Sequence, residues 1–168
     1  MTRTAPLSLA LLLALAAALP AEAQSARVLG DFRDWSSYAA DDGGGTICFA
    51  MTRPKSTEPT PAGYGEAYLY VTNRPGEDVA NEFNVVAGYT FQTGSMAIAR
   101  VGGQEFPLFT QGDAAWLDDA AQAANLAAAI RAGANIVIEG TAADGARIVQ
   151  TYSLSGATAA QQATGAEC

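Results

Sequence analysis

Short stretches with the alternating pattern of half-buried β-strands recur along this chain. The clearest is EAYLYVTN at residues 66–73, where Leu69 and Val71 alternate with tyrosine and polar positions. Turn-forming residues separate the stretches, and the pair Gly102-Gly103 is typical of a tight hairpin, whose central residues need a positive φ. Around eight short strands with this spacing favour an antiparallel β-sandwich over a parallel α/β sheet, with a small closed barrel as the second choice.

The strand pattern can be placed along most of the sequence. The expected strands cover residues 27–35, 46–52, 66–73, 82–89, 95–101, 104–109, 135–141 and 147–154. Pro107 lacks an amide donor, so we expect its strand at a sheet edge. Residues 38–45 are rich in Asp and Gly and predict a turn. Residues 53–65, with three prolines and two glycines, predict an exposed loop.

Two helices are expected among the strands. Asp118 and Asp119 lie where a helix begins, because carboxylates favour its positive end, and Gly133 lies where it ends. Ser155 is expected to cap a final helix that runs through Gln162. The sequence therefore predicts a mainly β chain, an antiparallel β-sandwich with one inserted helix and a short C-terminal helix.

The start of the chain has the parts of a secretory signal peptide. Arg3 gives a positive beginning, residues 6–19 form an apolar core, and small residues lead up to Ala23. The apolar run is shorter than the ~20 residues of a membrane-spanning helix. We expect residues 1–23 to be a signal peptide cleaved after Ala23. Residues 24–168 would then form one domain without an integral membrane segment, located in the periplasm or secreted.

The charge of the chain limits its partners. The net charge is −8, and it stays −8 after cleavage because residues 1–23 carry one base and one acid. Lys55 is the single lysine, and the arginines are scattered rather than clustered. Phosphate backbones are bound by clustered Lys and Arg, so we expect no binding to nucleic acid.

The chain contains no histidine, which removes the Ser-His-Asp and Cys-His nucleophiles and most zinc sites. Paired carboxylates can hydrolyse glycosides, and adjacent acids occur at Asp41-Asp42, Glu77-Asp78 and Asp118-Asp119. Each pair lies where a turn or a helix start would place solvated acids. We therefore expect no enzyme activity, no catalytic residue, no metal site and no cofactor, and keep a carboxylate-based hydrolase as an alternative.

Cys48 and Cys168 are the only two cysteines. In an oxidising compartment two cysteines of one domain most often form a disulfide, which here would tie the carboxyl terminus to the core. The alternative is a reactive Cys48 thiolate, which would need a neighbouring base or helix start. Residues 47–51, however, have the pattern of a buried strand.

Three tyrosines are candidates for contact with a protein partner. If the helix does not cover the face of Tyr68 and Tyr70, these rings and Tyr64 form an exposed aromatic surface beside the loop that carries Arg53 and Lys55. The alternative is that the helix packs on this face, or that a tyrosine hydroxyl anchors the fold.

Six blocks in a fixed order extend over nearly all of residues 24–168. They are GDFRDW (30–35), ICFAMTRPKSTEP (47–59), AYLYVTNRP (67–75), NEFNVVAGY (81–89), FTQGDAAWLDDA (109–120) and GTAADGARIVQTYSLSG (140–156), followed by Cys168. Together they resemble the invasion-associated locus B family of bacterial proteins. The resemblance implies an exported protein with an immunoglobulin-like β-sandwich, and it supports the Cys48–Cys168 pairing. It supplies no catalytic residues.

The resemblance also bears on function, because the family is named for a role in host-cell invasion by a pathogen. We expect an exported, non-catalytic envelope protein that acts through interaction with an unknown protein partner in the periplasm. The alternative is a surface-displayed or secreted factor that promotes host-cell contact or invasion.

Overall fold

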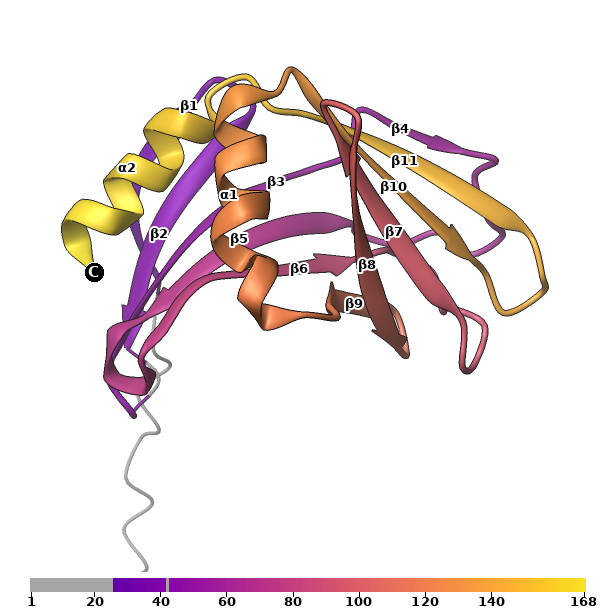
Figure 1. The fold of residues 1–168 in the computed structure, drawn as a ribbon, viewed down its shortest axis with the longest axis horizontal. Coiled ribbons are helices and arrows are strands. Elements are labelled where there is room, and N and C mark those ends of the chain that lie inside the picture. Colours follow the sequence, from indigo (N-terminus) through magenta and orange to yellow (C-terminus); the bar gives the residue numbers. More distant parts are fainter. Residues whose placement is uncertain (1–25, 42) are drawn as a thin grey trace, which may run out of the picture.

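The computed structural model describes residues 26–41 and 43–168, which form a strongly curved antiparallel sheet with two α-helices at one end (Figure 1). The expected signal peptide, residues 1–23, and Asp42 lie outside the described residues. The strands are β1 (Arg27–Phe32), β2 (Trp35–Asp41), β3 (Thr46–Thr52), β4 (Ser56–Glu58), β5 (Tyr68–Arg74), β6 (Val79–Val86), β7 (Met96–Val101), β8 (Gln104–Gln111), β9 (Ala114–Leu117), β10 (Asn135–Thr141) and β11 (Arg147–Ser153). The helices are the 3-10 turns η1 (Pro75–Glu77) and η2 (Ala120–Gln122), and the α-helices α1 (Ala123–Ala132) and α2 (Ala157–Glu167).

All eleven strands belong to one hydrogen-bonded sheet. Its order is β1-β2-β3-β5-β6-β9-β8-β7-β10-β11-β4, and every pairing is antiparallel. The chain passes directly from β3 through residues 53–55 to β4, which pairs with β11 at the far edge. The Lys55 amide donates to the Thr151 carbonyl at 2.7 Å, and the Asp34 amide donates to the Ser155 carbonyl at 3.2 Å. The sheet is therefore bent so far that its two ends meet.

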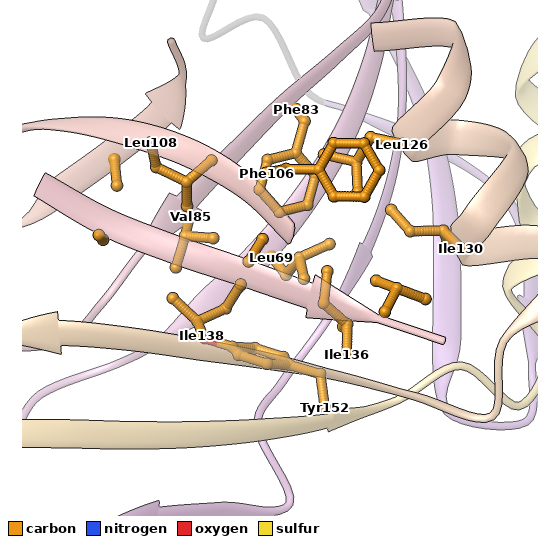
Figure 2. Packing of buried hydrophobic residues seen from close by; sticks show 14 of the residues in the cluster. Leu69, Phe83, Val85, Phe106, Leu108, Leu126, Ile130, Ile136, Ile138 and Tyr152 are labelled. Atoms are coloured by element: carbon orange, nitrogen blue, oxygen red, sulfur yellow. The ribbon is translucent and has the colours of Figure 1, made fainter. Parts of the chain in front are cut away.

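The core lies between the two halves of this bent sheet. Leu69 of β5 and Val85 of β6 pack towards Ile138 of β10 and Tyr152 of β11, and α1 adds Leu126 (Figure 2). These five side chains are fully buried. Alternate residues of the strands other than β1 and β4 supply the core, because successive side chains of a strand point to opposite faces.

Buried polar side chains join the two halves across the core. The Trp35 indole nitrogen on β2 donates to the Ser153 carbonyl on β11 at 2.9 Å. The Gln150 amide nitrogen on β11 donates to the Ala87 carbonyl, just past β6, at 2.9 Å. Each bond satisfies a group that would be costly to bury unpaired. The expected mainly β fold, with antiparallel strands packed face to face and two helices, is confirmed.

Both α-helices pack against the inner face of the sheet. On α1, Leu126 and Ile130 are fully buried in the core. On α2, the Ala160 carbonyl accepts a hydrogen bond from the buried Ser37 hydroxyl of β2 at 2.9 Å, which places α2 on the core side of that strand. The outer faces of β2, β3 and β5 are therefore left without a helix.

The first expected strand is wrong in detail, because residues 27–35 form part of a hairpin. β1 and β2 are joined at Arg33 and Asp34, and Arg33 has a φ of 59°. This left-handed conformation is usually marked by Gly or Asn, so the turn gave no signal in the sequence. The expected turn at residues 38–45 is correspondingly shorter, because β2 continues to Asp41.

Three further expectations are corrected. The expected loop at residues 53–65 contains the short edge strand β4. Residues 114–117 form β9, which has only four residues and no strong pattern. The strand of Pro107 is internal rather than at an edge, since β8 lies between β7 and β9. The Pro107 carbonyl accepts a hydrogen bond from the amide of Asp118, the residue that follows β9. Proline has no amide hydrogen to donate on that side, but β9 has already ended there.

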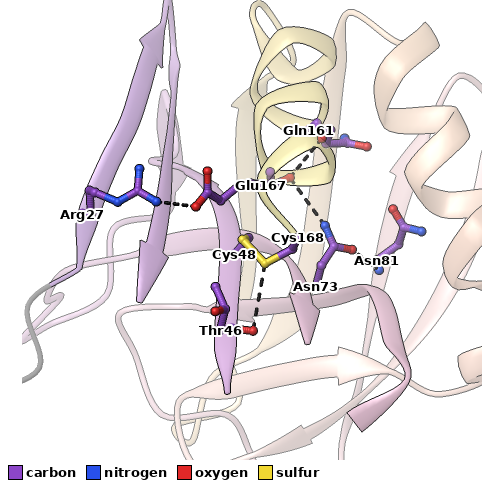
Figure 3. The surroundings of a disulfide bond; sticks show 9 residues. Arg27, Thr46, Cys48, Asn73, Asn81, Gln161, Glu167 and Cys168 are labelled. Atoms are coloured by element: carbon purple, nitrogen blue, oxygen red, sulfur yellow. Dashed lines mark hydrogen bonds and ion pairs between the residues drawn. A yellow bond between two sulfur atoms is a disulfide. The ribbon is translucent and has the colours of Figure 1, made fainter. Parts of the chain in front are cut away.

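The predicted disulfide is present and joins β3 to the end of α2 (Figure 3). The Cα atoms of Cys48 and Cys168 are 6.0 Å apart, and 120 positions separate them in the sequence. Cys48 is fully buried, and an ion pair between Arg27 and Glu167 lies beside the bridge. The alternative of a reactive Cys48 thiolate is therefore wrong.

Within the described residues, no helix has both the length and the apolar character needed to cross a bilayer.

We expect the disulfide to stabilise the protein by about 4–5 kcal/mol at most, because it closes a very long loop in the unfolded chain. Cys48→Ala and Cys168→Ala should lower the Tm by similar amounts, and reduction should bring the wild type to the same Tm. Alanine is the suitable replacement because a serine hydroxyl at position 48 would be buried. Thermal unfolding with and without dithiothreitol tests this. An unchanged Tm after reduction of the wild type would contradict it.

Candidate functional site

Tyr68 and Tyr70 lie on the outer face of β5, with ring centroids 5.9 Å apart. Leu69 and Val71, between and after them, are buried on the inner face. Because both helices pack on that inner face, the alternative that a helix covers the tyrosines does not hold. Both rings are half-buried, which leaves part of each available to a partner.

Arg53 belongs to the same surface. Its guanidinium carbon lies 4.8 Å from the centroid of the Tyr68 ring, a cation–π distance. The guanidinium also hydrogen-bonds the Tyr68 hydroxyl at 2.7 Å and pairs with Glu66 at 2.6 Å. The Tyr68 hydroxyl in turn donates to Glu66 at 2.7 Å. The structure therefore brings Arg53, Tyr68 and Tyr70 together at one end of β5.

The environment changes the acidity of both tyrosines. The hydrogen bond to the Glu66 carboxylate raises the pKa of Tyr68, since it stabilises the protonated phenol. Burial is the main cause that raises the pKa of Tyr70, and the neighbouring Tyr68 adds to it. Both phenols stay neutral hydrogen-bonding groups at physiological pH.

Tyr64 and Lys55 lie beside Arg53 and each has its own hydrogen-bond partners. The Tyr64 hydroxyl hydrogen-bonds the Thr57 hydroxyl at 2.8 Å and accepts from the Gln150 amide at 3.2 Å, so this ring helps to hold β4 and β11 in place. The Lys55 ammonium pairs with Asp34 at 2.5 Å, and this hydrogen bond is the largest cause that lowers the pKa of Asp34. Both residues nevertheless line one hollow together with Arg53 and Glu66, so they border the surface formed by Tyr68 and Tyr70.

The surface around Tyr70 continues across neighbouring strands, through a diagonal ring contact on the β3 side and through direct pairs on the β6 side. Tyr38 on β2 stacks on Phe49 of β3 at 5.2 Å between centroids, and Phe49 meets Tyr70 edge to face at 6.1 Å. On the other side, Tyr70 pairs with Asn84 of β6, and Asn84 pairs with Trp116 of β9. Residues directly opposite in a sheet point to the same face, so all of these side chains lie on the outer face.

The register extends this row to both sides of the sheet. Trp116 pairs with Phe109 of β8, and the two rings stack at 5.4 Å. Phe109 pairs with Met96 of β7, and at the other end Tyr38 pairs with Val28 of β1. We call this row the outer aromatic stripe. Its members are Val28, Tyr38, Phe49, Tyr70, Trp116, Phe109 and Met96, with the polar Asn84 between Tyr70 and Trp116.

The stripe contains the most exposed large hydrophobic residues of the described chain. Val28, Met96 and Phe109 have exposed fractions of 55%, 49% and 41%. Single exposed hydrophobic residues are ordinary on protein surfaces, whereas a contiguous apolar patch marks an interaction site. Here all three lie in one cross-strand row with four aromatic side chains.

Two of the paired acids, Asp41 and Asp119, have local roles in a turn and at a helix start. Asp41 accepts from the Gly43 amide at 2.8 Å, and Asp119 accepts from the Ala121 amide at 3.0 Å at the start of η2. Glu77 and Asp78 form the exposed end of η1 and the residue after it. These are the positions that the sequence predicted for solvated acids. Within residues 26–41 and 43–168, no group of three Cys, Asp or Glu side chains is placed to hold a metal ion.

Comparison with known proteins assigns the family. A family profile described as "Invasion associated locus B (IalB) protein" matches residues 35–165. The chain belongs to the invasion associated locus B family. The crystal structure of invasion associated protein B from Bartonella henselae aligns with 82% of this chain and 96% of that chain, with a TM-score of 0.53 and 14% sequence identity. This likeness shows that the two share a fold. No curated protein matches the sequence.

We expect Glu66→Ala to lower the pKa of Tyr68 towards its ordinary value, because the variant loses the carboxylate that accepts the phenol hydrogen bond. NMR titration of the tyrosine Cζ resonances measures each pKa separately. Glu58→Ala is the matched control, since Glu58 is an exposed acid on β4. An equal Tyr68 pKa in the wild type and Glu66→Ala would contradict the hydrogen bond.

Proposed function

We propose that this member of the invasion associated locus B family is an exported, non-catalytic envelope protein that acts through protein–protein interaction in the periplasm. The observation that carries the proposal is the outer aromatic stripe. Its exposed side chains contribute little to folding, because they remain in water in the folded protein. Aromatic side chains and methionine are also the residues enriched where proteins bind one another.

Two further features support export. A disulfide persists in oxidising compartments and is rare in the cytosol, and the bridge between Cys48 and Cys168 is buried at its β3 end. The sequence of residues 1–23 has the pattern of a signal peptide, which would deliver the chain to such a compartment. The non-catalytic part of the proposal is supported by Asp41 and Asp119, which are engaged as turn and helix caps.

A surface-displayed or secreted factor that promotes host-cell contact is the second candidate. It is favoured by the words "invasion associated" in the family description and in the name of the Bartonella henselae protein. The same stripe would then face another cell rather than a periplasmic protein. Location in the cell distinguishes the two candidates.

We expect a tagged form of the full chain to be protected from added protease in intact cells and digested once the outer membrane is opened. The measurement is an immunoblot, with a cytoplasmic protein and an exposed outer-membrane protein as markers. Digestion in intact cells, or recovery of the tagged protein from the medium, would reject the periplasmic proposal and support the host-contact candidate.

We expect the double variant Phe49→Ser/Tyr70→Ser to lose most of the crosslinked protein that the wild type captures in the periplasm. Val137→Ser is the matched control, because Val137 is half-buried on the outer face of β10, away from the stripe. Each variant is first checked for wild-type unfolding behaviour. A folded double variant that captures the same protein in the same amount would show that the stripe does not mediate the interaction.

A further inference from the structure

One part of the stripe borders a groove, and the surface around this groove differs in charge from the outer face over β7, β10 and β11. A groove of about 390 Å³ lies beside Phe109 and Trp116. Its floor includes the buried Phe83 and Leu117, and its walls are the start of β6 and the residues at the start of α1. We call it the Phe109–Trp116 groove.

The groove exists because two neighbouring strands part at this point. β9 pairs with β6 only over residues 84–86, although β6 begins at Val79. Beyond Leu117 the chain turns away into η2 and α1. The apolar side chains of Phe83 and Leu117, where β6 and β9 separate, therefore line a groove that opens to solvent.

The two chain segments that form the groove are strongly acidic. Residues 74–82 and 116–123, which border the groove, together carry five acidic residues and one basic residue, Arg74. Asp78 and Glu82 line the groove itself. Arg74 forms an ion pair with Glu82, so the single base does not offset the remaining acids.

Asp118 adds to the charge at the same rim. Its amide donates to the Pro107 carbonyl at 3.0 Å, which places Asp118 opposite Pro107, two residues along β8 from Phe109 and just outside the residues that line the groove. The outer face over β7, β10 and β11 is different. There Arg100 pairs with Glu105 and Glu139, and Arg147 also pairs with Glu139, so the charges balance.

We infer that the Phe109–Trp116 groove is the docking site for a partner protein segment whose apolar side chains are flanked by lysine or arginine. This inference rests on the proposed function and names the chemistry of the partner. Apolar side chains would enter the groove beside Phe109 and Trp116, and the flanking cations would lie against Asp78 and Asp118. A second copy of this chain is a poor occupant, because it would bring another acidic rim to the same place.

The test uses the full mature protein and a synthetic acetylated peptide with a Leu-Val-Phe centre between pairs of lysines. Trp116 is a built-in reporter, because it is half-buried at the groove whereas Trp35 is only 1% exposed. We expect saturable changes in tryptophan fluorescence and in the amide NMR signals of residues around the groove. A peptide with glutamates in place of the lysines should bind at least about tenfold more weakly.

Variants separate the apolar and the charged contributions. Phe109→Ser should weaken peptide binding by roughly tenfold or more, as for the loss of a central aromatic contact. The double variant Asp78→Asn/Asp118→Asn should weaken it by roughly fivefold, and added salt should reduce that difference. Asparagine suits position 78, whose φ is 55°, because it tolerates this conformation. Val137→Ser, on the outer face of β10 and outside both the stripe and the groove, should leave peptide binding unchanged.

Several outcomes would overturn the inference. Equal binding of the lysine and glutamate peptides would show apolar adhesion without charge selection, and unchanged binding to Phe109→Ser would place the contact elsewhere. Sedimentation that shows a dimer lost in Phe109→Ser would assign the groove to a second copy. If Phe49→Ser/Tyr70→Ser still loses its periplasmic partner while the lysine peptide does not bind, the proposed function stands and the groove assignment fails.

Discussion

The placement of side chains in this protein depends on its one continuous antiparallel sheet, in which each residue points either to the inner or to the outer face. Direct cross-strand partners share a face, so the pairs Tyr70–Asn84, Asn84–Trp116 and Trp116–Phe109 fix side chains on four strands to the same side. A slip of one residue at any pairing would move core side chains into water and stripe side chains into the core. Because Leu69 and the other core residues of these strands are buried on the inner face, the residues of the stripe must lie on the outer face.

Closure of the sheet decides which of its two faces remains open. The inner face is covered by the opposite half of the sheet and by both α-helices, and the disulfide holds α2 there through Cys168, the residue that follows the helix. The described chain has no other α-helix to place on the outer face. Apolar groups of Val28, Met96 and Phe109 consequently stay in water, where they add little to folding stability and remain free to stabilise a complex.

Much of this fold could be predicted from the sequence, and the exceptions have physical causes. The strands β3 and β10 match their expected ranges because their apolar and β-branched runs are dense. The β1–β2 turn was missed because Arg33 adopts a conformation that normally needs Gly, and β9 because four residues are too few for a periodic pattern. The disulfide followed from the cysteine count and the resemblance.

The candidate site was predictable only along a single strand. Alternation in β5 placed Tyr68 and Tyr70 on one face, and the neighbouring Arg53 joined them. The sequence could not connect them with Phe109 or Trp116, because that connection depends on the order β5-β6-β9-β8, in which β9 and β8 are inverted relative to the chain. Tyr64 lines a hollow beside Arg53, as its spacing predicts, while its hydroxyl accepts a hydrogen bond from Gln150 of the other half of the sheet.

Charge and apolar exposure have separate consequences on the outer face. Six of the basic residues in the described chain form ion pairs, which neutralise acids such as Glu66, Glu139 and Glu167. The rim of the Phe109–Trp116 groove keeps acids, including Asp118, that no cation in the described chain offsets. Apolar contact supplies most of the affinity of an interface, whereas charge chiefly sets the rate of encounter and the choice of partner. An apolar face with an acidic rim therefore repels anionic lipids and further copies of itself, and it attracts a segment that combines apolar and basic residues.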